Sequence, residues 1–137
     1  MPDVGLTHVA LPVRDPQKSV AFYRKYAGME VVHRRVDADE GIEVVWLSDR
    51  TRPFAIVLLQ SDEVAHPLRP NGHLGVGCAS RDDVDRLCRL AEGDGALLMG
   101  PKDSGYPVGY WALLKDPDGH TLEIAFGQEV GLTVEGE

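Results

Sequence analysis

Residues Thr7 to Tyr23 read THVALPVRDPQKSVAFY, an alternating apolar segment followed by a segment with helical spacing. A similar pattern returns in residues 72–87, which read GHLGVGCASRDDVDRL, so that His73 stands 65 positions after His8. Alternation places successive side chains of a strand on opposite faces, whereas spacing of three and four residues places them on one face of a helix. The repeat therefore predicts a strand followed by a helix, twice along the chain.

Capping residues support both expected helices. In the first copy, Asp15 suits an N-cap, Pro16 suits the first helical position and Gly28 suits the C-terminal end. In the second copy, Ser80 and Asp83 resemble a capping box. Each helix thus has a start signal in the sequence that matches its apolar stripe.

Three strand-like segments follow each expected helix, so the repeated unit is βαβββ. We expect an α+β fold in which two tandem βαβββ modules form a curled mixed sheet around a cleft. The predicted strands are Glu30–Val36, Glu43–Leu47 and Phe54–Gln60 in the first copy, and Ala96–Gly100, Tyr110–Leu114 and Thr121–Phe126 in the second.

Length and composition favour one compact domain over residues 1–137. The chain has 137 residues, of which 43% are hydrophobic, enough for one sizeable core but few for two independent domains. Within this domain we expect module 1 at about 5–60, a connector at 61–71, module 2 at about 72–127 and a weakly structured tail at 128–137.

Charge and the length of the apolar runs argue against nucleic-acid and membrane partners. The chain has 14 basic and 22 acidic residues, a net charge of −8, and no basic run, so a phosphate backbone would be repelled and no nucleic-acid partner is expected. No apolar run approaches the roughly 20 residues that span a bilayer, and no leader-like segment begins the sequence. We therefore expect a cytoplasmic protein with no membrane partner, in which Cys78 and Cys88 are reduced and structural.

Three polar residues in strand-like segments form a candidate metal site: His8, His73 and Glu123. In each segment the ligand residue shares its face with small residues, while the larger apolar residues lie on the other face. Two imidazoles and one carboxylate can occupy one side of a metal ion and leave coordination positions open for a substrate. The small residues on the three faces are Ala10, Gly75, Gly77 and Ala125.

These features resemble the vicinal oxygen chelate superfamily, which includes glyoxalase I, extradiol dioxygenases, fosfomycin-resistance transferases and bleomycin-resistance proteins. The resemblance covers nearly the whole chain and includes the paired modules, His8, the stretch NGHLGV at 71–76 and the stretch DPDGHTLE at 116–123. It implies that His8, His73 and Glu123 bind one divalent metal ion that substrate oxygens chelate. Fe2+ or Mn2+ is favoured, with Zn2+ or Ni2+ as alternatives.

Two departures from the family pattern bear on the reaction. Glyoxalase I has a further carboxylate in the last strand of its first module, and here that place falls on Ile56 or Val57. Extradiol dioxygenases carry a tyrosine three residues before the Asp-Pro turn, where this chain has Leu113, and Tyr110 lies three residues earlier still. Glyoxalase I activity is therefore disfavoured, ring cleavage by the usual route is in doubt, and no catalytic acid or base is assigned.

Three large apolar residues are candidates to line the substrate site: Trp46, Trp111 and Leu113. Counting by alternation from the ligand strands places all three on the ligand faces, which favours an aromatic or hydrophobic substrate. The competing interpretation is that both tryptophans are ordinary core residues, because large aromatic side chains are commonly buried.

The sequence thus favours a divalent-metal-dependent enzyme acting on a small oxygenated, aromatic or hydrophobic substrate by dioxygenase-like, lyase or isomerase chemistry. The alternative is a ligand-sequestering protein of the bleomycin-resistance type, whose members generally lack the metal ligands. A purely structural metal is less favoured, since such sites usually have four protein ligands. We expect a homodimer, in which the site is completed within one chain or across two.

Overall fold

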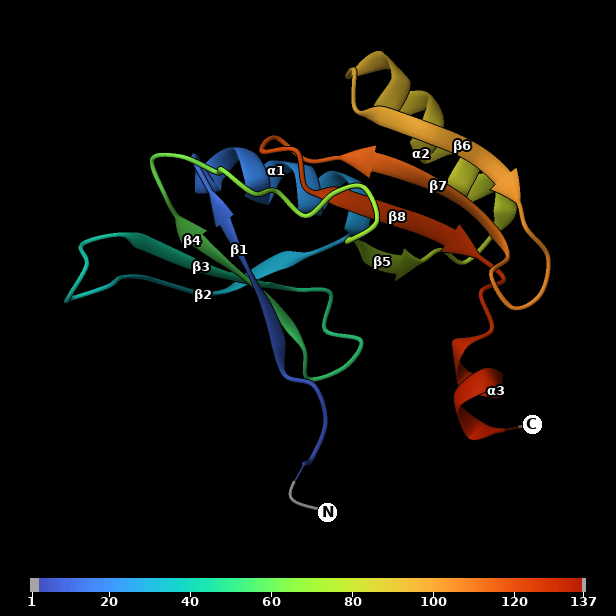
Figure 1. Ribbon diagram of the computed structural model, residues 1–137, viewed down its shortest axis with the longest axis horizontal. Helices are drawn as coiled ribbons and strands as arrows, with labels where there is room; N and C mark the ends of the chain where they lie inside the picture. The colour runs from blue at the N-terminus through green and yellow to red at the C-terminus, as the bar shows by residue number, and fades with distance from the viewer. Residues whose placement is uncertain (1–2, 137) are drawn as a thin grey trace. The chain divides into compact units, whose positions relative to one another are not determined.

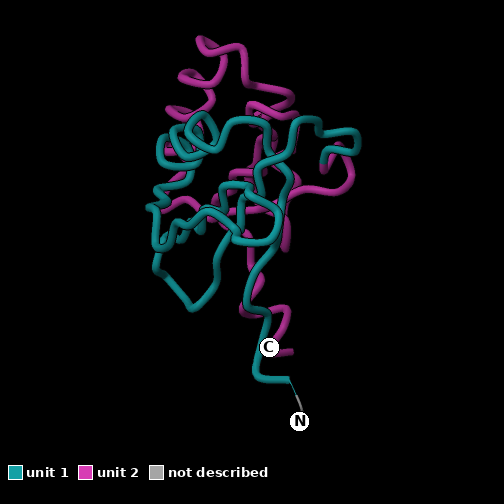
Figure 2. The backbone as a smooth tube through the Cα atoms, turned by 90° about the vertical axis from the view of Figure 1, so that its left-hand side faces the viewer, with its two compact units in different colours: residues 1–67 teal, residues 68–137 magenta. Residues whose placement is uncertain are grey.

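The computed structural model describes residues 3–136 and divides the chain into two compact units, with the boundary between Pro67 and Leu68. Figure 2 colours the first unit teal and the second magenta. Each unit holds one open four-stranded mixed sheet and one long helix (Figure 1). The predicted α+β fold with two tandem βαβββ modules is confirmed.

The first unit contains a sheet with the strand order β1-β4-β3-β2. Strand β1 pairs in parallel with β4, and the other neighbours pair antiparallel. Its elements are β1 (His8–Val13), α1 (Pro16–Ala27), β2 (Glu30–Val36), β3 (Glu43–Ser48) and β4 (Ala55–Gln60).

The second unit repeats this connectivity, with the strand order β5-β8-β7-β6 and a parallel pair β5–β8. A short third helix follows its last strand. Its elements are β5 (Leu74–Gly77), α2 (Arg81–Gly93), β6 (Leu97–Asp103), β7 (Tyr110–Lys115), β8 (Thr121–Phe126) and α3 (Val130–Glu135).

The helix ends agree with the capping residues. The Asp15 carboxylate accepts a hydrogen bond from the Gln17 backbone N–H at 3.0 Å, and Gly28 ends α1 in the left-handed conformation at φ 61°. The Ser80 hydroxyl accepts from the Asp83 backbone N–H at 3.1 Å and starts α2. Such caps satisfy backbone groups that the helix itself leaves unpaired.

Each long helix covers one face of its own sheet. In the first unit, Val20 and Tyr23 of α1 are buried, as are the helix-facing strand residues Leu11, Val13 and Leu58. In the second unit α2 contacts β6, β7 and β8 through an equivalent apolar stripe. Burying one such aliphatic side chain contributes about 1.5–3 kcal/mol, so these faces hold each unit together. The opposite face of each sheet is left for the candidate ligands.

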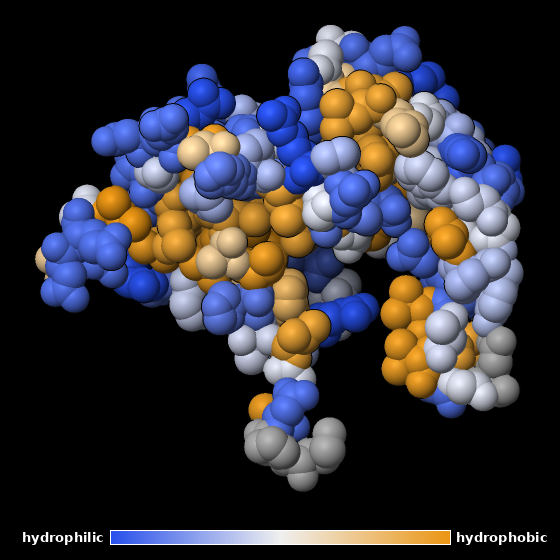
Figure 3. All heavy atoms as spheres, viewed as in Figure 1, coloured by the Kyte–Doolittle hydropathy of each residue, from blue (hydrophilic) through white to orange (hydrophobic). Residues whose placement is uncertain are grey.

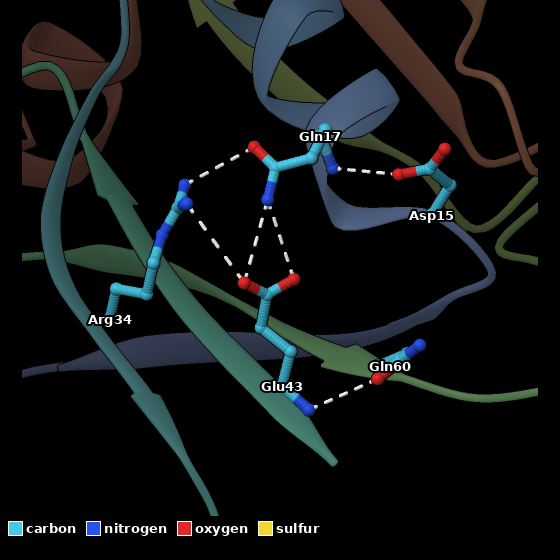
Figure 4. Close-up of polar contacts among 5 residues, drawn as sticks. All are labelled: Asp15, Gln17, Arg34, Glu43 and Gln60. Atoms are coloured by element: carbon cyan, nitrogen blue, oxygen red, sulfur yellow. Dashed lines mark hydrogen bonds and ion pairs between the residues drawn. The ribbon is translucent and has the colours of Figure 1, made fainter.

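A polar cluster ties the start of α1 to the first sheet (Figure 4). The Gln17 carboxamide donates to both oxygens of the Glu43 carboxylate at 3.4 and 3.5 Å, and the Arg34 guanidinium lies 3.9 Å from Glu43. The Glu43 backbone N–H donates to the side chain of Gln60 at 3.1 Å. The cluster lies on the helix-covered face, which fits a structural role.

Two expectations about strand and tail boundaries are wrong. His73 is not part of a strand, because the pairing of β5 with β8 begins at Leu74 opposite Leu122. The tail is not weakly structured throughout, because Val130–Glu135 forms α3, with the Thr133 N–H bonded to the Glu129 carbonyl at 3.1 Å. Figure 3 shows apolar atoms gathered over α3, whose Val130, Leu132 and Val134 are exposed.

The Asp-Pro-Asp-Gly turn before β8 is a buried hydrogen-bonded structure. The Asp116 carboxylate accepts from the backbone N–H groups of Asp118 and His120, both at 2.9 Å. The His120 side chain is 1% exposed, and its Nδ1 accepts from the backbone N–H of Leu68 at 2.9 Å. The buried His120 side chain therefore joins Leu68, at the end of the connector, to the turn.

We expect Asp116→Ala to lower the free energy of unfolding by about 2–5 kcal/mol, because two buried N–H groups lose their acceptor. Asp116→Asn keeps an acceptor oxygen and should lose less. Urea denaturation of both variants, with Asp62→Ala at an exposed connector position as control, measures the difference. Equal losses for the alanine and asparagine variants would contradict this account of the turn.

Candidate metal centre

His73 and Glu123 lie side by side in the second unit. The Nε2 atom of His73 is 3.6 Å from Oε1 of Glu123, and the two side chains are 37% and 13% exposed. The structure therefore brings together two of the three predicted ligands within one unit.

The parallel pairing of β5 with β8 produces this proximity. Gly75 pairs with Glu123, and His73 stands two residues before Gly75. A Cβ atom on Gly75 would lie in ordinary van der Waals contact with the carboxylate, 3.9 Å from Oε2 of Glu123. Glycine thus leaves the space beside Glu123 open on the face away from α2.

His73 and Glu123 are each oriented by a hydrogen bond at the atom that does not face the other residue. The Nδ1 atom of His73 lies 2.9 Å from the carbonyl oxygen of Asn71, which can only accept, so Nδ1 carries a proton. The Oε2 atom of Glu123 accepts from the Gln128 carboxamide at 3.0 Å. With Nδ1 protonated, Nε2 of a neutral ring presents a lone pair, as a metal-binding histidine requires.

The third predicted ligand, His8, begins β1 in the first unit. Its ring Nδ1 lies 2.9 Å from the Thr7 hydroxyl, and its side chain is exposed. Alternation along β1 places His8 on the face opposite the buried Leu11 and Val13. His8 therefore lies on the sheet face that α1 leaves uncovered.

Matching registers locate the first-unit counterpart of Glu123. Ala10 pairs with Val57 in the parallel pair of the first sheet, as Gly75 pairs with Glu123 in the second. Of the two candidates for the additional carboxylate position, Val57 is therefore the equivalent residue, and Ile56 points toward the helix. The first sheet thus has an aliphatic side chain at the position where the second sheet has the candidate ligand Glu123.

The structure places Trp46, Trp111 and Leu113 on the ligand faces of their own sheets. Trp46 pairs with Val57, while Trp111 and Leu113 pair with Ala125 and Glu123. These cross-strand partners lie on the same face as the residues they oppose.

The two tryptophans have different surroundings. Trp46 is 38% exposed and its ring meets the His33 ring edge-on at 5.1 Å. The Trp111 indole N–H donates to the Ser104 hydroxyl at 2.8 Å. Neither ring is buried in the core, so both can offer apolar surface to a ligand.

Tyr110 lies on the opposite face of β7 from Trp111. Its hydroxyl donates to the Asp85 carboxylate of α2, and the Arg81 guanidinium lies 3.8 Å from its ring centroid. The hydrogen bond to Asp85 raises the pKa of Tyr110 above its usual value. Tyr110 therefore does not face Glu123, which agrees with the absence of a family-type tyrosine at Leu113.

The donor set fits a divalent cation. Two ligands about 2.0–2.2 Å from one ion lie about 3.3–3.8 Å apart at tetrahedral or trigonal angles. At the right angles of octahedral coordination they lie about 2.8–3.1 Å apart. The 3.6 Å between Nε2 of His73 and Oε1 of Glu123 falls in the tetrahedral range and is about 0.5 Å longer than the octahedral one. Among residues 3–136, no group of three or more His, Cys, Asp or Glu side chains is arranged as a metal site.

Two tandem four-stranded mixed sheets of the same connectivity are the architecture of the vicinal oxygen chelate superfamily. Residues 5–124 match the Glyoxalase/Bleomycin resistance protein/Dioxygenase superfamily model, and the chain belongs to this superfamily. The resemblance noted in the sequence is thereby confirmed.

Three known proteins illustrate the similarity. An uncharacterized protein of Pseudomonas aeruginosa is 37% identical over 129 residues, covering 92% of this chain and 91% of that protein. A probable lactoylglutathione lyase of Vibrio cholerae is 26% identical, with 96% of each chain covered. A mutant of the fosfomycin resistance protein FosX of Listeria monocytogenes, complexed with Mn(II), is 17% identical and has a TM-score of 0.75, covering 96% of this chain and 98% of that one.

In the described part of the chain, no helix is long and apolar enough to cross a membrane.

Both thiols are poor nucleophiles in the folded protein. Burial raises the pKa of Cys88 to about 11 and also raises the pKa of Cys78. A thiolate is the reactive and metal-binding form, so the raised pKa values keep the thiolate fraction of both cysteines low at neutral pH.

We expect Cys88 to react with iodoacetamide about 100-fold more slowly at pH 8 in the folded protein than in urea, because a raised pKa reduces the thiolate fraction. Its rate should rise with pH up to about 11. Mass spectrometry of a Cys78→Ala variant isolates Cys88. A folded-state rate equal to that in urea would refute the protected-thiol assignment.

Proposed function

We propose that the chain is a divalent-metal-dependent enzyme acting on a small oxygenated substrate with an aromatic or hydrophobic part. The observation that carries the proposal is the His73–Glu123 pair, 3.6 Å apart, with each side chain held by a hydrogen bond to a residue outside the pair. With a neutral His73 ring both atoms offer lone pairs, and a divalent cation bound between them would satisfy both.

In this proposal His73, Glu123 and His8 bind the metal, with His8 supplied by the same chain or by a second copy. The bound metal would polarise substrate oxygens as a Lewis acid or, as iron, support chemistry with oxygen. Asn71 holds the His73 ring in the tautomer that exposes Nε2, and Gly75 leaves room beside the carboxylate.

Apolar residues would bind the rest of the substrate. Leu113 pairs with Glu123 and Trp111 pairs with Ala125, so both offer surface close to the carboxylate on the same face. Such surface displaces water from a ligand and strengthens polar interactions next to it. A substrate with a ring or a branched apolar group suits these neighbours.

Val57 argues against glyoxalase I chemistry, in spite of the similarity to a probable lactoylglutathione lyase. An aliphatic side chain at the position equivalent to Glu123 neither binds a metal nor moves a proton. We therefore favour Fe2+ or Mn2+ with dioxygenase-like chemistry, and keep Zn2+ or Ni2+ with lyase or isomerase chemistry as the alternative. A homodimer working in the cytoplasm completes the proposal.

The second candidate function is ligand sequestration without catalysis. The half-exposed Trp46, stacked edge-on against His33, is the observation that favours it. An exposed aromatic ring can pack against the ring of a planar ligand without a metal. The two functions differ in whether ligand binding depends on a cation.

We expect the untagged protein to hold close to one equivalent of metal per chain, and His73→Ala and Glu123→Gln to lose it, because each variant removes one donor. Elemental analysis after purification measures the content. His66→Ala, at an exposed connector histidine, is the matched control and should keep the metal. If the wild-type protein binds none of the four ions after reconstitution, the enzyme proposal is wrong.

We also expect catechol-like ligands with two adjacent oxygens to quench tryptophan fluorescence in the metal-loaded protein and much less after chelator treatment, because the metal supplies part of the binding energy. Trp46→Phe and Trp111→Phe, which replace the two tryptophans one at a time, identify the responding ring. Equal quenching with and without metal would favour sequestration.

A further inference from the structure

The residues directly after β8 reach back to the candidate ligand Glu123. The Gln128 side-chain nitrogen donates to Oε2 of Glu123 at 3.0 Å and to the carbonyl oxygen of Val108 at 3.4 Å. A carboxamide nitrogen has two hydrogens, so each of these bonds uses one of them. Gln128 thus links the carboxylate to the loop between β6 and β7.

Backbone contacts fix where Gln128 lies. Gly109 has φ +86°, and a Cβ atom on it would lie 2.5 Å from the carbonyl oxygen of Phe126 and 2.8 Å from the carbonyl carbon of Gly127. Only glycine allows this close approach. On the other side of Gln128, the Glu129 N–H donates to the Pro107 carbonyl at 2.9 Å. The loop and the segment after β8 are therefore held together on both sides of Gln128.

This loop is also tied to the ligand face of the sheet. Ser104, at its start, accepts from the Trp111 indole N–H at 2.8 Å. The Ser104 N–H in turn donates to the Gly109 carbonyl at 3.0 Å, and the Gly109 N–H donates to the Gly105 carbonyl at 2.8 Å. These hydrogen bonds fix the conformation of the loop, and the loop in turn fixes the position of Gln128.

The two oxygens of Glu123 have different partners. Gln128 occupies Oε2, while Oε1 is the atom that lies 3.6 Å from Nε2 of His73. A carboxylate oxygen that accepts a strong hydrogen bond is a weaker competitor for a cation, and the bond also restricts rotation of the carboxylate.

We infer that Gln128 is a positioning residue that makes Glu123 a one-oxygen ligand by engaging Oε2 and directing Oε1 toward His73. The inference rests on the proposed metal site. The segment after β8 then controls the orientation of the Glu123 carboxylate, and the loop of residues 104–109 contributes by holding this segment in place. A one-oxygen ligand also leaves more open positions on the ion than a carboxylate binding through both oxygens would leave.

The test uses the full chain loaded with Co2+, because the visible absorption of this ion responds to coordination number and geometry. Gln128→Leu removes both donors at similar size, and Gln128→Asn keeps the donors but shortens their reach. Gln17→Leu is the matched control, since Gln17 also donates to a glutamate, Glu43, on the helix-covered face of the first sheet. Calorimetry gives the affinity, and thermal unfolding of the metal-free proteins reports on folding.

We expect Gln128→Leu to weaken Co2+ binding about 10–100-fold and to change the position and intensity of the visible bands, as loss of an outer partner of a ligand does. Gln128→Asn should give a smaller loss, and Gln17→Leu should keep the wild-type affinity and spectrum. Wild-type affinity and spectrum in Gln128→Leu would overturn the inference while leaving the metal site in place. Absence of binding in the wild-type protein would overturn the proposed function together with the inference.

Discussion

The parallel pairing of the first and last strand in each sheet is the constraint on which the other features depend. Parallel neighbours need a long crossover, and here the crossover is a helix followed by two further strands. The pairing of Gly75 with Glu123 brings a residue from the start of the module next to one from its end. A slip of one residue would turn Glu123 toward α2 and separate it from His73.

Polar ligands on a sheet face need support that the sheet itself does not supply. The strands use their own backbone groups in the ladder, so the bonds that orient His73 and Glu123 come from outside it. Asn71 lies before β5 and Gln128 lies after β8, and each bonds the ligand through the atom that is not facing the other ligand. The residues just outside the parallel pair therefore supply the groups that would orient the proposed ligands.

Local chemistry explains which features could be predicted from the sequence. Helix caps depend on neighbouring residues, so Asp15 and Ser80 were sufficient to place the start of each helix. Alternation likewise predicted that Trp111 and Glu123 share a face. The burial of His120 and the bond from Gln128 depend on the paths of a connector and a loop, which no periodic pattern encodes. Gly109 is the residue in the sequence that relates to the bond from Gln128. Its close approach to the segment after β8 becomes apparent only in the folded structure.

The equivalence of Val57 and Glu123 has a consequence for how this fold can change over time. Both sheets keep the same register, so the backbone that would present a carboxylate at position 57 is intact and only the side chain differs. A valine codon can become a glutamate codon through a single base change. A single substitution at position 57 can thus add a carboxylate on the uncovered face of the first sheet without moving a strand. The repeated architecture provides this second position.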